Sequence, residues 1–165
     1  MTDEDAAFQA ARRMTAMGRP EAGAALDAVL ARDPVHVAAL LLRATLRLEE
    51  RQDEAALALC RRAVAAAPRS SEAHNAVARC LHSLGRDEEG LAAAREAQAL
   101  LSEGDNALQS AAVYLTLVWC LRELRRHPEA LDVAEEGLTR SPDGVLAHWA
   151  SVVEEELARA QRQRC

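Results

Sequence analysis

The stretches ALDAVLARDP (residues 25–34) and ALCRRAVAAAP (residues 58–68) end in prolines that lie 34 positions apart. Both are rich in residues that favour helix, and both stop at a proline, which cannot continue a helix. A third helical segment ends near Ser102, and a fourth, ALDVAEEGLTRSP (residues 130–142), ends at Pro142 after a longer step of 40 positions. A recurring period of this size is typical of proteins built from helical repeats.

The middle of each unit also recurs, as GRPEA (18–22), RQDEAA (51–56), GRDEEG (85–90) and RHPEA (126–130). We interpret each as a turn followed by the start of a helix. Asp53 and Asp87 are predicted N-caps, and Pro20 and Pro128 suit the first helical turn. The unit is therefore helix, short turn, helix, turn, and nine helices are predicted for the whole chain.

The pattern resembles the tetratricopeptide repeat family, whose 34-residue unit has small or apolar residues at seven positions and a proline at position 32. The fourth unit matches those eight positions with Tyr114, Leu117, Val118, Leu121, Ala130, Ala134, Gly137 and Pro142. The resemblance implies an all-α, right-handed α-solenoid of about four helical hairpins. We divide the single domain, residues 1–165, into repeats at about 3–36, 37–70, 71–110 and 111–144 and a capping helix at 145–163.

Two regions depart from the regular period. The six extra residues in 101–110 are expected to extend the second helix of the third repeat, to turn at 104–106 and to start the next helix early. In the capping helix, Trp149 and the apolar residues that follow it lie on one face, at spacings of three and four. The acidic run Glu154, Glu155 and Glu156 is predicted to face solvent.

The composition supports the same fold and limits the function. The chain has 37 Ala, 23 Leu and four aromatic residues, and all 20 basic side chains are Arg. The shortage of β-branched and aromatic residues argues against β-sandwiches and nucleotide-binding α/β folds. The net charge is −6 and no long basic stretch is present, which disfavours nucleic-acid binding. No apolar run is long enough for a membrane span, and the composition predicts a bacterial cytoplasmic protein.

In the resembled family, the first helix of each repeat lines a concave groove that holds a partner segment. Carried over position by position, the resemblance implies a groove with aromatic, leucine and arginine side chains. We take the following residues as its predicted contacts: Phe8, Arg12, Leu42, Leu46, Asn75, Arg79, His82, Leu115, Trp119 and Arg122.

Arginines inside a groove of an acidic protein predict a partner segment with apolar anchors and one or two carboxylates. The most direct interpretation is a non-catalytic scaffold or adaptor that binds a peptide or helix of another protein. Two alternatives stay open. One is a bacterial secretion or assembly chaperone that shields an apolar client segment, and the other is a scaffold that assembles with copies of itself.

Catalytic and metal-binding patterns are weak. No Gly-rich phosphate loop and no HExxH or GxSxG motif is present, so we expect no enzyme and no cofactor. Cys80 and His82 are close in sequence but point to different faces of a helix, so we expect no metal site. The cysteines at 60, 80 and 120 are interpreted as small core residues, and a disulfide framework is not expected in a helical chain of this size.

Overall fold

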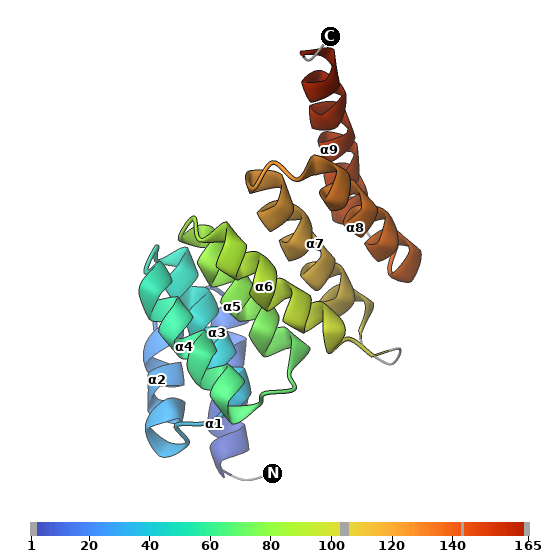
Figure 1. The fold of residues 1–165 in the computed structure, drawn as a ribbon. Coiled ribbons are helices and arrows are strands. Elements are labelled where there is room, and N and C mark those ends of the chain that lie inside the picture. Colours follow the sequence, from blue (N-terminus) through green and yellow to red (C-terminus); the bar gives the residue numbers. More distant parts are fainter. Residues whose placement is uncertain (1–2, 103–105, 143, 164–165) are drawn as a thin grey trace.

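The computed structural model describes residues 3–102, 106–142 and 144–163, and within these ranges the chain forms nine α-helices and no strand (Figure 1). The predicted all-α solenoid is confirmed. Each helix packs chiefly on its neighbours in sequence, and α3, α5, α7 and α9 also form a row of successive contacts. The helices are α1 (Asp3–Ala16), α2 (Ala22–Arg32), α3 (Val37–Glu49), α4 (Asp53–Ala66), α5 (Ser71–Ser83), α6 (Asp87–Ala99), α7 (Ala107–Glu123), α8 (His127–Arg140) and α9 (Gly144–Arg162).

The same turn joins the first and second helix of all four hairpins. One residue in each turn has a positive φ: Gly18, Arg51, Gly85 and Arg125, at 62°, 60°, 69° and 57°. The next amide along the chain bonds to a carbonyl five residues back, as the Arg86 N–H does to Leu81 O at 2.8 Å. This left-handed residue with its reverse bond is the Schellman ending of a helix. The turn therefore repeats in backbone geometry even where glycine is replaced by arginine.

The predicted N-caps at the second helices are wrong by one position. The caps of α4 and α6 are Gln52 and Arg86, neither of which makes a side-chain cap bond, while Asp53 and Asp87 are the first helical residues. A carboxylate at that place still favours the helix, because it lies beside the positive end of the helix dipole. Pro128 stands in the first turn of α8 as predicted.

Pro20 instead stands in the turn before Glu21, the N-cap of α2. It therefore precedes the helix that it was predicted to open. A proline fixes φ at a value that a turn residue also adopts, so it fits this earlier place as well.

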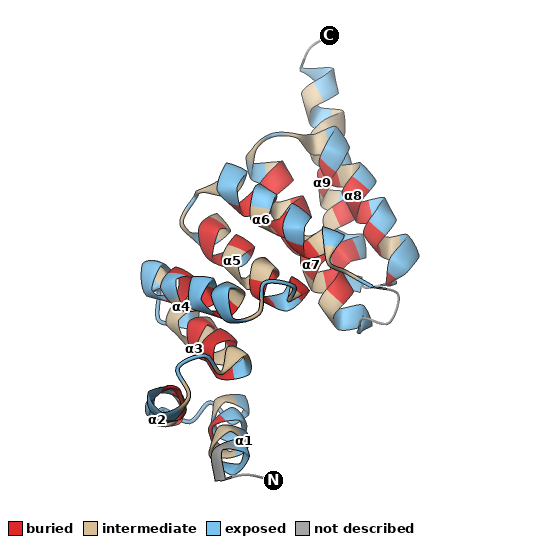
Figure 2. Cartoon of the chain, turned by 60° about the horizontal axis from the view of Figure 1, so that its bottom comes forward, coloured by how far each residue is buried: buried red, intermediate tan, exposed pale blue. Residues whose placement is uncertain are grey.

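The core runs along the helix interfaces and is built largely from small residues. Figure 2 shows the buried stripes on the faces where helices meet. The fully buried alanines include Ala11, Ala39, Ala56, Ala73 and Ala94. Small side chains let helix backbones approach closely, which accounts for much of the alanine content. Tyr114 is the largest fully buried side chain, and its hydroxyl donates to Glu136 at 2.8 Å.

The six extra residues of the third repeat are only partly placed as predicted. Helix α6 ends at Ala99 and has 13 residues, so the predicted extension of this helix is wrong. Helix α7 starts early, as predicted, and has 17 residues where α3 and α5 each have 13. Of the turn predicted at 104–106, Gly104 and Asp105 lie outside the described residues.

Helix α9 packs its apolar side on α8 and α7 and projects beyond both (Figure 1). Leu146 and Val153 are fully buried and Trp149 is half-buried, so the predicted apolar face is present and begins one turn earlier than expected. The prediction for Glu156 is wrong. Glu154 and Glu155 are exposed, but Glu156 is half-buried and its carboxylate accepts hydrogen bonds from Arg122.

The repeated turn predicts opposite effects for two glycine-to-alanine changes. Gly85→Ala adds a Cβ at a positive φ and should lower the free energy of unfolding by about 1–2 kcal/mol. Gly144→Ala adds a Cβ in open space at the start of α9 and should raise it by about 0.4–1 kcal/mol. Urea denaturation followed by circular dichroism measures both. Equal effects at the two positions would contradict the role given to the left-handed residue.

Candidate functional site

A groove of about 550 Å³ runs across the first helices of the four hairpins. It is open to solvent and mixes apolar with polar walls. Its lining residues come from α1, α3 and α5, from Asn106, the N-cap of α7, and from α7 itself. They are Phe8, Arg12, Ala38, Leu41, Leu42, Thr45, Glu72, Asn75, Ala76, Arg79, Asn106, Leu108, Gln109 and Ala112. Five of the ten predicted contacts are among them: Phe8, Arg12, Leu42, Asn75 and Arg79.

Asn75 is the most buried polar residue that lines this groove. Its side chain comes from the middle of α5 and is only 7% exposed, and its Oδ1 has no hydrogen-bond partner among the described residues. A buried acceptor without a partner costs roughly 1–3 kcal/mol. A ligand N–H that reached this oxygen would remove that cost.

Two cations line the same groove. Arg12 on α1 and Arg79 on α5 are both exposed, and neither forms an ion pair or hydrogen bond within the described part of the chain. Glu72, one helical turn before Asn75, is the single carboxylate among the described lining residues. These residues therefore include one more positive than negative side chain, although the protein as a whole is acidic.

The added first turn of α7 forms part of the groove wall. Leu108 lies in this turn and is 73% exposed, and Asn106 caps the helix by accepting the Leu108 N–H at 2.9 Å. Gln109 lines the groove beside Leu108. The family pattern did not find these residues because they lie in the insertion, which has no counterpart in a regular 34-residue unit. The length of the insertion was the available signal.

The other five predicted contacts lie outside this groove. Leu46 and Leu115 are half-buried and pack against the hydrophobic clusters of the core. His82 and Trp119 stack on each other with ring centroids 6.0 Å apart, and Trp149 of α9 meets the edge of Trp119 at 6.3 Å. The structure thus brings these aromatic rings together at the junction of α5, α7 and α9, and their role in binding stays a prediction.

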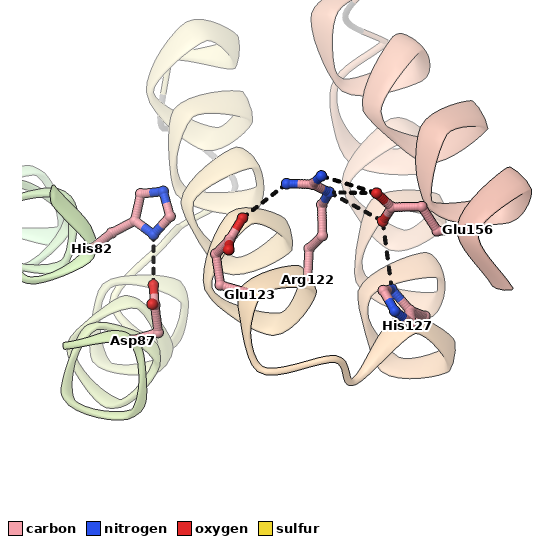
Figure 3. Close-up of polar contacts among 6 residues, drawn as sticks. All are labelled: His82, Asp87, Arg122, Glu123, His127 and Glu156. Carbon is pink, nitrogen blue, oxygen red and sulfur yellow. Dashed lines mark hydrogen bonds and ion pairs between the residues drawn. The ribbon is translucent and has the colours of Figure 1, made fainter. Parts of the chain in front are cut away.

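Arg122 connects α7 to α9 (Figure 3). Its guanidinium donates to both carboxylate oxygens of Glu156 at 2.9–3.0 Å and to Glu123 at 2.8 Å. It also lies 5.4 Å from the ring centre of Trp149, a cation–π distance. The hydrogen bonds to Glu156 raise the pKa of Arg122 above its usual value. This arginine is thus already neutralised by its own chain, unlike Arg12 and Arg79.

A second polar cluster lies at the junction of α5, α6 and α7. His82 Nδ1 and Asp87 Oδ1 are 2.6 Å apart, as drawn in Figure 3. The Cys120 sulfur lies within 4.8 Å of a ring nitrogen of His82 and of a carboxylate oxygen of Asp87. Burial, together with the charge of Asp87, raises the pKa of the Cys120 thiol to about 12. Within the described ranges this is the one group with three donors of the kinds that bind metal ions.

Sequence reasoning missed this cluster because its members come from three helices. Spacing within one helix rightly separated Cys80 from His82. It gave no reason to bring Cys120, 38 positions further on, to the same point. Cys80 instead lies against Cys60, with the two sulfurs 3.6 Å apart in the core. The cysteines at 60, 80 and 120 are all free and buried.

Together, the helical hairpins, their repeated turns and the groove along the first helices define a helical repeat protein. The family model of the tetratricopeptide repeat matches residues 8–71 and, overlapping them, 53–105. The chain therefore belongs to the tetratricopeptide repeat family, whose fold is a protein–protein interaction module. No curated protein matches the chain in sequence.

Solved structures of other repeat proteins share the fold at low sequence identity. TTC0263, a thermophilic tetratricopeptide repeat protein of Thermus thermophilus, superposes with a TM-score of 0.79 at 17% identity, covering 94% of this chain and 84% of that one. PilW, a type IV pilus biogenesis factor, gives 0.79 at 20% identity, with 99% and 71% covered. MamA gives 0.72 at 18% identity, with 96% and 86% covered.

Among the described helices, none has the length and hydrophobicity needed to cross a membrane.

The contact of Arg122 with Glu156 predicts that α9 is anchored by a charged pair. Glu156→Gln removes the charge that neutralises a half-buried guanidinium and should lower the free energy of unfolding by about 1–2 kcal/mol. Glu155→Gln is the matched control, because its pair with Arg159 is exposed and should contribute less than about 0.5 kcal/mol. Thermal unfolding of the two variants gives the comparison. Equal losses would show that the α7–α9 contact does not depend on this pair.

Proposed function

We propose that this chain is a non-catalytic scaffold or adaptor that holds a short segment of a partner protein in the groove of α1, α3, α5 and α7. The observation that carries the proposal is Asn75, whose buried acceptor lies in the groove without a partner. A structure keeps such a group at a cost in stability. Binding of a segment that supplies the missing donor accounts for that cost.

The groove sets the kind of segment that fits. Phe8, Leu42 and Leu108 form the apolar surface of the groove. Its volume of about 550 Å³ lies within the range of roughly 300–1,000 Å³ that is typical of small-ligand sites, so a few residues of an extended or helical segment would fill it. The Asn75 oxygen accepts an N–H of the segment. Arg12 and Arg79 then receive its carboxylates, because a guanidinium binds a carboxylate through two parallel hydrogen bonds.

The charge of the groove selects against basic segments. A partner with lysine or arginine at these positions would place like charges beside two unpaired guanidinium groups, which costs affinity. We expect a partner segment with one or two acidic residues between apolar anchors. The remaining predicted contacts, His82, Trp119 and Arg122 among them, would extend the site only if a longer partner reached the junction with α9.

Self-assembly is the alternative that a separate observation favours. Large apolar side chains stand exposed at several places, including Met17 at 71% and Val35 at 64% in addition to Leu108. A second copy that covered Leu108 would also cover the groove that this side chain lines. Light scattering of the purified protein separates the two functions: a monomer that binds peptide supports the adaptor, and a dimer that excludes peptide supports self-assembly.

A chaperone for secretion or assembly, acting in a bacterial cytoplasm, is a narrower form of the same binding function. It shares the groove but needs a client whose apolar segment is kept from aggregating. Suppression of that client's aggregation by a stoichiometric amount of this protein would support this form, and stable retention of a folded partner would support the adaptor.

The peptide preference is tested by selection from a random peptide library, followed by fluorescence anisotropy with the selected sequence. We expect apolar peptides with acidic residues, bound at least about tenfold more weakly by Arg79→Glu, since a hydrogen bond to a charged group contributes roughly 1.5–3 kcal/mol. Arg95→Glu is the control, because Arg95 lies on α6, away from the groove lining, and bonds to Gln98. Unchanged affinity in Arg79→Glu would refute the proposed contact.

Asn75→Leu separates binding from stability. Replacing an unpartnered buried amide by an apolar side chain of similar size should leave the free energy of unfolding unchanged or slightly higher. The same change should weaken binding of the selected peptide severalfold, because the acceptor is lost. Urea denaturation and anisotropy on one preparation measure both effects. A variant that loses stability while keeping its affinity would mean that Asn75 has a structural role instead.

A further inference from the structure

The junction of α5, α6 and α7 offers a second kind of site, which does not depend on the groove. We propose that His82, Asp87 and Cys120 bind a divalent transition-metal ion, with Zn²⁺ the best match to their donor atoms. Each residue comes from a different helix, and the three donor atoms all lie within 4.8 Å of one another. An ion here would join three consecutive helices of the solenoid.

The distances suit a small tetrahedral ion after a modest adjustment. Zinc lies about 2.0–2.1 Å from nitrogen, about 2.0–2.2 Å from oxygen and about 2.3 Å from sulfur, which sets the donors roughly 3.3–3.6 Å apart. His82 Nδ1 and Asp87 Oδ1 are 2.6 Å apart because they share a hydrogen bond. Replacing this bond by an ion requires the His82 and Asp87 atoms to separate by less than about 1 Å and the Cys120 sulfur, now within 4.8 Å of the other donors, to lie about 3.6 Å from them.

The donor set selects the class of ion. A thiolate and an imidazole bind zinc and its neighbours in the transition series, whereas Mg²⁺ and Ca²⁺ prefer sites made of oxygen alone. On binding, the Cys120 thiol gives up its proton to solvent. His82 Nδ1 loses to solvent the proton that it donates to Asp87, and the neutral ring carries its one proton on Nε2 instead, so that Nδ1 is free to coordinate. The His82 side chain is 29% exposed, so a water molecule completes the fourth position from that side.

The surrounding residues hold the donors in place. Gly90 brings α6 close to its neighbours: a Cβ at this position would lie 3.2 Å from the Cys120 sulfur and 3.2 Å from the Ala78 carbonyl oxygen. The ring of Trp119 stacks on the His82 imidazole and limits its rotation. Contacts of this outer kind orient metal ligands in known sites.

The nearby thiol pair is the main competitor and is less suited. The Cys60 and Cys80 sulfurs lie 3.6 Å apart and are buried, and no third donor joins them within the described ranges. The test must nevertheless separate the two sets of thiols, because a pair of cysteines alone also binds soft metal ions.

Cobalt(II) chloride is the first probe, since a thiolate bound to Co²⁺ produces a sulfur-to-metal charge-transfer absorption. We would titrate it into a chain with Cys60→Ala, Cys80→Ala and Cys165→Ala, in which Cys120 is the single remaining thiol. We expect this absorption at a one-to-one stoichiometry, and its loss when Cys120→Ala is added. Absence of the absorption, or its survival in the chain without thiols, would overturn the proposal. Circular dichroism first establishes that each variant is helical.

A second measurement keeps all cysteines and changes an accessible ligand. Isothermal titration with Zn²⁺ compares the natural chain with His82→Ala and with His148→Ala, an exposed histidine on α9 that lies outside the cluster. Loss of an outer-shell partner alone lowers metal affinity about 10- to 100-fold, so loss of a ligand should weaken binding by more than tenfold. His148→Ala should bind as the natural chain does. Equal binding by all three would refute the assignment of His82.

Discussion

The close approach of neighbouring helices at small side chains is the constraint on which the rest of this structure depends. Buried alanines recur at the helix interfaces from α1 to α8. Each hairpin is stabilised by the hairpins beside it, because one hairpin alone has no partner for its apolar side. The row of first helices, and therefore the groove, exists only because these interfaces set a regular spacing. A larger residue at such a contact would shift every hairpin that follows.

Because the core is rich in small residues, its larger and charged side chains contribute stabilisation at a few places. An alanine buries little area, so its contribution is small compared with that of a leucine or an aromatic residue. The larger side chains gather towards α7, α8 and α9, where Tyr114 fills the core and Trp149 meets the guanidinium of Arg122. At the other end, Arg43 is buried between α2 and α3 and pairs with Asp27 at 2.8 Å. Directional pairs thus add specificity where packing alone would leave the helices free to slide.

The sequence was sufficient to predict features that repeat and insufficient for features that occur once. The period predicted the eight helices of the four hairpins and the turns within them, because each unit must satisfy the same packing and the same chain reversal, and the spacing of apolar residues predicted the last helix of the described chain. The extra turn of α7, the half-buried Glu156 and the thiol of Cys120 beside Asp87 have no counterpart in other units. These depend on contacts between repeats, and the spacing of residues along one helix contains no information about them. The errors at Asp53 and Asp87 are of a different kind. Both helices start where they were predicted to start, but each aspartate is the first helical residue and the N-cap is the residue before it.

Helix α5 shows why sequence position alone grouped residues that the structure separates. Glu72, Asn75, Arg79 and His82 follow one another at steps of three and four and therefore form one stripe along the helix. The first three line the groove, but the imidazole of His82 is bonded to Asp87 and stacks on Trp119. A stripe is available to a partner only where the protein's own side chains leave it unoccupied. Asn75 and Arg79 have no bonded partner within the described residues, whereas His82 has one, so α5 lines the groove along residues 72–79 and joins an internal polar contact in its last turn.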